Sequence, residues 1–222
     1  MDSLKQDARL QAMLAKLHAR SRAQEATLAR HTTEMGFRSV AGSAADVAAD
    51  RAFYADKLVA LDADKAEFCY RLCRAMGART LVEAGTSYGV STLYLAAAVR
   101  DNGGGSVIAT EYEAPKAAMA REHFAQAGLA DCIDLREGDL RQTLQSLPPV
   151  VDFLLLDIWI AMVPATLELV GPHLRAGAVV VADNTASNRA RYASLFDYFA
   201  AHGFSTQTLP FAGGFEMAVK TG

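Results

Sequence analysis

Residues 80–92, Thr-Leu-Val-Glu-Ala-Gly-Thr-Ser-Tyr-Gly-Val-Ser-Thr, decide the fold of this chain. The apolar start predicts a buried strand, Gly85 and Gly89 predict a tight turn, and a helix is expected from Val90. Free N–H groups at the start of a helix can hold an anion such as a carboxylate. Glu83 places an acid at the end of the strand. The stretch therefore indicates a site for a ligand that carries both an ammonium and a carboxylate.

Downstream of this stretch, strand and helix patterns alternate. We expect strands at 80–84, 107–111, 133–136, 151–156 and 178–182, helices at 90–100, 115–127, 140–147, 163–175 and 188–202, and a final hairpin of 205–210 with 215–220. Within the strands at 151–156 and 178–182, residues 153–156 and 178–182 are continuously apolar, as in parallel strands that are covered on both faces. The pattern predicts an α/β fold with a Rossmann-like, seven-stranded, mostly parallel sheet, an antiparallel C-terminal hairpin strand and helices on both faces.

The N-terminal part has a different organisation. We expect residues 1–63 to form a helical extension, a lid or dimerisation element, and residues 64–222 to form the main domain. Within 3–29, Leu10, Met13, Leu14 and Leu17 follow a helical stripe, which could dock on the domain, cover the site or pair with a second copy. We favour a homodimer. Residues 31–50 are weakly patterned and predict a linker or a mobile lid.

Composition narrows the class of protein. The 222 residues suffice for one domain with a full core, and a net charge of -3 gives no electrostatic reason to expect nucleic acid or acidic membranes. Cys69 and Cys73 lie four residues apart without further cysteine or histidine partners, which favours buried thiols. The polar N-terminus lacks a signal-peptide core, and no apolar run approaches the ~20 residues of a membrane span. We expect a cytoplasmic enzyme that acts on a small molecule.

Polar residues follow each expected parallel strand, at the edge where such sheets bind ligands. Glu111 could accept hydrogen bonds from ribose hydroxyls. Asp139 could accept from an adenine amino group, with Leu140 packed on the ring, or it could cap the following helix. The polar ends together indicate a nucleotide-like ligand at this edge.

Asp157, Asp183 and Asn184 add hard oxygen atoms from two neighbouring strand ends. Such a set suits Mg²⁺ or another hard divalent cation. The alternative is that Asp183 and Asn184 cap the next helix while Asp157 orients a ligand ammonium.

These motifs together resemble the class I S-adenosylmethionine-dependent O-methyltransferases, in the branch of the catechol and caffeoyl-CoA O-methyltransferases. The resemblance covers roughly residues 64–220 and rests on EAGTSYGVST, the acid of IATEYE, REGDL, LLLDIW and VVVADN. It implies methyl transfer to a hydroxyl of a small, catechol-like acceptor, assisted by a metal. Its implied cofactor-binding residues are Glu83, Gly85, Ser87, Ser91, Glu111, Asp139, Leu140 and Asp157. It also implies Asp157, Asp183 and Asn184 as metal ligands, Asp157 as a catalytic residue, and Trp159 in the acceptor pocket, although a lone tryptophan can also be a core residue.

The chain departs from this pattern at Ile160. The family's D-x-x-K motif has a lysine at that position, thought to be the general base, and isoleucine cannot carry a proton. A metal could acidify the hydroxyl directly, or His31 or Glu34 could act as base, although a solvated linker position is the simpler interpretation of His31. Alternatively the substrate differs or catalysis has been lost. The last case would leave a non-catalytic binding protein on a methyltransferase scaffold.

Two other enzyme classes match less well. Gly85-Thr-Ser87-Tyr-Gly89 fits the nucleophile elbow of α/β-hydrolases, and His202 follows in triad order. No oxyanion-loop motif precedes it, and Glu83 would have no role. A dinucleotide-dependent oxidoreductase is disfavoured because G-x-G-x-x-G is absent.

Overall fold

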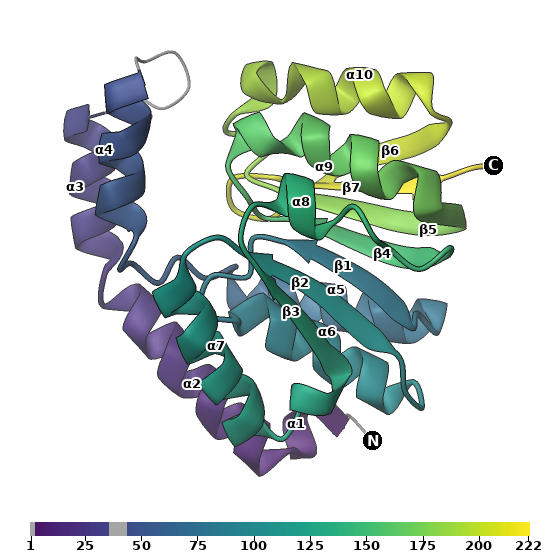
Figure 1. Ribbon diagram of the computed structural model, residues 1–222, viewed down its shortest axis with the longest axis horizontal. Coiled ribbons are helices and arrows are strands. Elements are labelled where there is room, and N and C mark those ends of the chain that lie inside the picture. Colours follow the sequence, from purple (N-terminus) through teal and green to yellow (C-terminus); the bar gives the residue numbers. More distant parts are fainter. Residues whose placement is uncertain (1–2, 36–43) are drawn as a thin grey trace.

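A computed structural model describes residues 3–35 and 44–222, and its centre is a seven-stranded sheet (Figure 1). The strands are β1 (Thr80–Ala84), β2 (Ser106–Glu111), β3 (Ile133–Glu137), β4 (Val151–Leu156), β5 (Leu174–Asp183), β6 (Phe204–Leu209) and β7 (Phe215–Lys220), in the order β3-β2-β1-β4-β5-β7-β6. β7 runs antiparallel to both of its neighbours, and the other pairings are parallel. The predicted fold class is confirmed.

Helices cover both faces of the sheet. On one face lie α5 (Ala63–Met76), α6 (Val90–Asp101) and α7 (Ala114–Ala127), and on the other lie α8 (Leu140–Thr143), α9 (Val163–Val170) and α10 (Ala193–Ala201). Successive strand residues point to opposite faces, so Leu81 packs in the first layer and Val82 in the second. This double coverage explains why most residues of the central strands are apolar.

The middle of the sheet determines where a ligand can bind. β1 lies between β2 and β4. After β1 the chain adds β2 and β3 on one side of it, and then crosses over to add β4 and β5 on the other side. Such a switch point opens a crevice at the carboxyl ends of the strands. The ends of β1 and β4 stay close there, because the Asp157 amide donates to the Ala84 carbonyl at 3.1 Å.

Several expected helix ends were wrong. The helix expected at 163–175 ends at Val170, a 3-10 turn covers Gly171–His173, and β5 begins at Leu174. Pro172 has no amide to continue the helical hydrogen bonds, which explains the early end. Gly177 lies inside β5 with φ +75°. The helix expected at 188–202 is a 3-10 turn, Arg189–Tyr192, followed by α10, and α8 ends at Thr143.

The described residues of the N-terminal segment, 3–35 and 44–63, contain the helices α1 (Ser3–Gln6), α2 (Ala8–Arg22), α3 (Glu25–Met35) and α4 (Ala44–Tyr54). The stripe of Leu10, Met13, Leu14 and Leu17 is buried, with α2 lying along α7 in Figure 1. The stripe therefore packs within its own chain, where it is not free to form a dimer.

The segment 31–50, expected as a linker or a mobile lid, is helical at 31–35 and 44–50, which does not fit an irregular linker there. The second piece contains four alanines, whose helix propensity outweighs the weak apolar pattern. Residues 36–43 of that expected linker lie outside the described residues. In Figure 1, α3 and α4 stand side by side away from the sheet.

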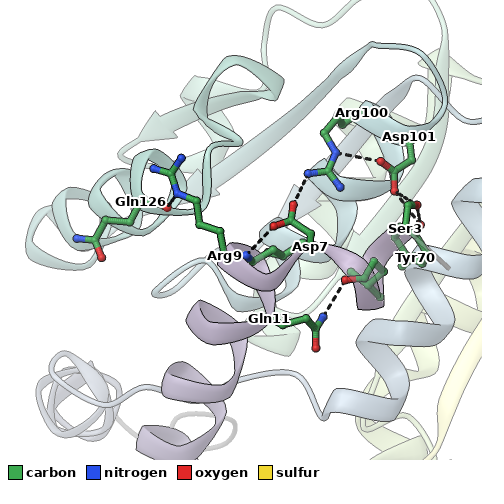
Figure 2. Close-up of polar contacts among 10 residues, drawn as sticks. Ser3, Asp7, Arg9, Gln11, Tyr70, Arg100, Asp101 and Gln126 are labelled. Atoms are coloured by element: carbon green, nitrogen blue, oxygen red, sulfur yellow. Dashed lines mark hydrogen bonds and ion pairs between the residues drawn. The ribbon is translucent and has the colours of Figure 1, made fainter.

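A polar network fastens α1 and α2 to the domain (Figure 2). Asp7 caps α2 by accepting from the Leu10 amide at 3.0 Å, and its other oxygen accepts from Arg100 Nη1 at 2.6 Å. Asp101, at the end of α6, accepts from Ser3 at 2.5 Å and from the Tyr70 hydroxyl at 2.8 Å. These contacts join the extension to α5 and α6.

Asp7→Asn should lower the free energy of unfolding at pH 7 by about 1 kcal/mol, because it removes the charge that pairs with Arg100. Burial alone would raise the pKa of Asp7, but the Leu10 amide and Arg100 hold it below the ordinary value of 3.8. A depressed folded pKa gives stability that is present above 3.8 and is lost as pH falls through the folded value. Urea unfolding should show a deficit in the free energy of unfolding of Asp7→Asn relative to the wild type at neutral pH, and this deficit should fade at acid pH. Asp134→Asn, in an exposed pair with Arg136, is the control, and a deficit independent of pH would contradict the account.

Candidate active site

The turn after β1 is shaped by two glycines. Gly85 has φ +100°, and a Cβ there would lie 2.0 Å from the Asp157 carbonyl oxygen, so the ends of β1 and β4 leave no room for a side chain. Gly89 has φ +87°, and its Cβ would meet the Phe124 ring at 2.3 Å. α6 begins directly afterwards at Val90, which directs its free N–H groups toward this turn.

Glu83 lies fully buried beneath the turn. It accepts from the Thr86 hydroxyl at 2.9 Å and from the Thr92 hydroxyl. Burial raises its pKa, although the hydroxyls of Ser91, Thr92 and Thr86 act in the opposite sense. Sequence reasoning missed the threonines, since their role depends on how the turn folds back over the strand end.

Glu111, at the end of β2, faces the same turn. Its Oε2 accepts from the Ser87 amide at 2.7 Å and its Oε1 from the Glu113 amide at 2.7 Å. Burial raises its pKa, while these amides and the buried charge of Lys116 act to lower it. A carboxylate oxygen can accept more than one hydrogen bond, so a ligand hydroxyl can still be bound.

Ser87 is held in an unusual conformation at the centre of this turn. Its φ is +50°, and its Oγ is buried without a hydrogen-bond partner among the described residues. Strain and an unpaired buried polar atom concentrate at functional sites. Ser87 also lines a pocket with Gly85, Ser91 and Asp157 beneath the segment that contains Leu58 and Leu61. The structure thus brings four of the expected cofactor-binding residues together around one hollow.

Asp139 has the capping geometry that we considered as its alternative role. It begins α8 by accepting from the Arg141 amide at 2.9 Å, and the Arg141 guanidinium binds the same carboxylate. Leu140 next to it is buried. The adenine contact of these two residues stays a prediction.

The ends of β4 and β5 form an acidic cluster around a buried lysine. Lys65 is 2% exposed, and its Nζ lies 2.7 Å from Asp183 Oδ1 and 3.0 Å from Asp62 Oδ2. Burial alone would lower the pKa of Lys65, but the two aspartates raise it above its ordinary value, so the side chain is an ammonium. Burial, and then the charges of Asp183 and Glu83, raise the pKa of Asp157 well above its ordinary value.

This cluster does not fit the expected Mg²⁺ site. Asp183 Oδ1 also accepts from the Asn184 amide at 2.8 Å, and Oδ2 accepts from Asn184 Nδ2 at 2.9 Å, so the side-chain nitrogen of Asn184 faces the aspartate. An ammonium on the same carboxylate would repel a divalent cation. Within the described part of the chain, no group of three or more histidine, cysteine, aspartate or glutamate residues has the arrangement of metal ligands.

Sequence reasoning missed Lys65, although a signal was present. Lys65, Cys69 and Cys73 follow one another at four-residue spacing on the buried face of α5. A lysine on an apolar helix face needs a partner, because an unpaired buried charge is costly. The two cysteines are free and buried, as expected, and burial raises the pKa of both thiols.

An aromatic cluster of His31, Phe53, Tyr54 and Trp159 lies beside the site. Trp159 is 41% exposed, which excludes a core role, and its ring meets Tyr54 edge-on at 5.5 Å between centroids. His31 stacks on Phe53 at 3.6 Å and pairs with Asp50 at 3.3 Å, so the solvated linker position was wrong for it. Ile160 packs against the second core layer. Glu34 is exposed.

The hydrolase interpretation fails on geometry. α10 runs from the carboxyl ends of the strands back to their amino ends, where His202 caps it and its Nδ1 bonds the Tyr198 carbonyl. Ser87 lies at the other end of the sheet. The two residues cannot act as base and nucleophile of one site.

Proteins of known sequence and structure share this fold. A methyltransferase domain family matches residues 82–185. A catechol O-methyltransferase of Mycobacterium tuberculosis is 32% identical over 57% of this chain, and the match spans 57% of that protein's length. Cofactor-bound Rv0187 from MTB has a TM-score of 0.68 at 25% identity, covering 88% of this chain and 95% of its own. An O-methyltransferase from Bacillus cereus in complex with SAH has a TM-score of 0.68 at 22% identity, covering 92% and 100%.

The chain is therefore similar to methyltransferases: residues 82–185 match a methyltransferase domain, and the fold is shared with solved O-methyltransferases. The curated relative that it matches, over little more than half of each chain, is a catechol O-methyltransferase. None of this chain's described helices is both long and apolar enough to cross a membrane.

Proposed function

We propose that this chain transfers the methyl group of S-adenosylmethionine to a hydroxyl of a small, catechol-like acceptor. The observation that carries the proposal is the convergence of the Gly85 turn, Glu111 and Asp157 at the switch point of the sheet. The relatives support it: one is a catechol O-methyltransferase, and the Bacillus cereus neighbour is in complex with SAH.

The residues present fit the methyl donor. The turn cannot hold a side chain at Gly85, and Ser87 has a buried hydroxyl without a partner. The α6 N-terminus and Ser91 would hold the carboxylate, Glu111 the ribose, and the Asp157 carboxyl group the ammonium. When bound, S-adenosylmethionine supplies an electrophilic methyl group. The chain contributes by holding acceptor and donor in line and by excluding water.

The aromatic cluster would hold the acceptor. Trp159, two residues after Asp157 in the chain, is exposed, and the rings of α3 and α4 extend from it. A flat aromatic acceptor can stack against such rings. His31, paired with Asp50, stays the candidate for the base that Ile160 does not supply.

Trp159→Ala should raise the acceptor KM by about tenfold, since an exposed aromatic contact contributes on the order of 1.5 kcal/mol. Its affinity for S-adenosylmethionine should stay unchanged. Methyl transfer to catechol, measured against catechol concentration, gives the KM, and calorimetry gives the affinity. Val150→Ala removes a similarly exposed side chain at the amino end of β4 and should change neither value. An unchanged KM in Trp159→Ala would remove Trp159 from the acceptor site.

A second candidate function is favoured by Ile160. A chain without the usual base could bind S-adenosylmethionine and act as a binding protein. Incubation with labelled S-adenosylmethionine and a panel of catechols separates the two, because binding without transfer supports this candidate. Ile160→Lys should raise transfer to catechol if the missing lysine limits the rate.

Metal assistance, a homodimer and a cytoplasmic location stay predictions. Of these, metal assistance has the least support, since Lys65 and Asn184 already bond Asp183. The apolar stripe of α2 does not support the homodimer, since it is buried within the chain.

A further inference from the structure

Lys65 places a buried ammonium against Asp183 in the acidic cluster at the ends of β4 and β5. Its ammonium bonds Asp183 Oδ1 at 2.7 Å, and α5 brings it there from a part of the sequence far from the strand ends. Asp62, directly before α5, bonds the same ammonium at 3.0 Å and is half exposed. The lysine is thus held between a buried and an exposed carboxylate.

Several acidic side chains near Lys65 favour a positive charge among them. Glu83, Asp157 and Asp183 are all buried or half-buried near the ends of β1, β4 and β5, and buried carboxylates need compensation by positive charge. Lys65 is fully enclosed, so water and salt screen its charge little. A covalently attached ammonium is always present, whereas a metal ion must be recruited from solution.

We propose that the Lys65 ammonium takes the place of a divalent cation in this cluster, so that the site works without metal. Lys65 is a positioning residue in this account: it holds Asp183, and through Asp183 the Asn184 side chain, at the acceptor end of the site. The proposal deepens the proposed function and rests on it for the acceptor. The Mn²⁺-binding experiment described next tests the proposal without depending on methyl transfer.

The first arm measures Mn²⁺ binding to the purified chain by electron paramagnetic resonance, with neither donor nor acceptor present. The wild type should show no site tighter than ~1 mM, a weak limit for a hard-cation site. Lys65→Met removes the charge at similar length, frees Asp183, and should create one site at least about tenfold tighter. Mn²⁺ should raise the melting temperature of this variant and leave that of the wild type unchanged.

Two controls accompany this arm. Lys65→Arg keeps the positive charge and should bind no Mn²⁺, and Lys57→Met removes an ammonium that pairs with the exposed Asp56 and should behave as wild type. A wild-type Mn²⁺ site that Asp183→Asn abolishes would overturn the proposal, as would a folded Lys65→Met that binds no better than wild type. The wild-type and Lys65→Arg measurements decide the question if Lys65→Met does not fold.

The second arm measures methyl transfer to catechol in EDTA. The rate should stay within about twofold of the rate in Mg²⁺, since no metal is required. Loss of activity that Mg²⁺ restores would contradict metal independence. If no transfer occurs under either condition, the proposed function fails, while the Mn²⁺ result still stands on its own.

Discussion

Gly85→Ala should weaken S-adenosylmethionine binding by at least about 100-fold, because the turn must open to admit a methyl group. The new Cβ would lie 2.0 Å from the Asp157 carbonyl oxygen and 2.8 Å from its carbon, and both are backbone atoms. The clash would separate the ends of β1 and β4, where the donor is expected to bind. Calorimetric titration measures the affinity, and circular dichroism checks that the variant is folded.

Gly104→Ala is the matched control for this change. Gly104 has φ +109°, similar to Gly85, but a Cβ there meets nothing within 4 Å. Both variants carry the strain of an L-residue at positive φ, about 1–2 kcal/mol, and only Gly85→Ala adds the clash at the site. Gly104→Ala should therefore lose some stability and keep its affinity. Equal affinities of the two variants would contradict the assignment of the turn.

Glu111→Gln should weaken S-adenosylmethionine binding by about 30-fold, since hydrogen bonds to a charged acceptor contribute on the order of 2 kcal/mol. The amide can accept through one atom only, so either the Ser87 amide or the ligand hydroxyls lose a partner. Calorimetry on the wild type and the variant gives the ratio.

Glu113→Gln is the control for Glu111. Glu113 lies two residues later and forms an exposed ion pair with Arg51 at 2.8 Å. Glu113→Gln should leave the affinity for S-adenosylmethionine within about twofold of the wild-type value, because exposed ion pairs contribute little binding or folding energy. A loss in Glu113→Gln as large as that in Glu111→Gln would show that general charge, not the ribose contact, controls binding.

The sheet could be predicted because its signals are local. The apolar runs at 153–156 and 178–182 predict buried strands, and the glycines around Gly85 predict a tight turn. The positions of Glu83, Glu111 and Asp157 at the strand ends then follow from the topology of the sheet. Helix ends were less predictable. The end of α9 depends on Pro172, and the following turn packs Gly171 directly under Tyr198 from α10.

The errors at the site arose from tertiary contacts. Asp183 and Asn184 have the residue types of a metal site, and nothing within the strand-end motifs indicates that α5 places Lys65 on the same carboxylate. His31 was expected in a linker because its neighbours lack an apolar stripe, yet Phe53 and Tyr54 enclose it. Contacts between distant segments are not visible in local periodicity.

The most direct test of the central claim is calorimetric titration of the wild-type chain with S-adenosylmethionine in EDTA. The account predicts saturable binding at one site per chain. No detectable binding would contradict the assignment of the switch-point crevice as the methyl-donor site, and with it the proposed methyl transfer.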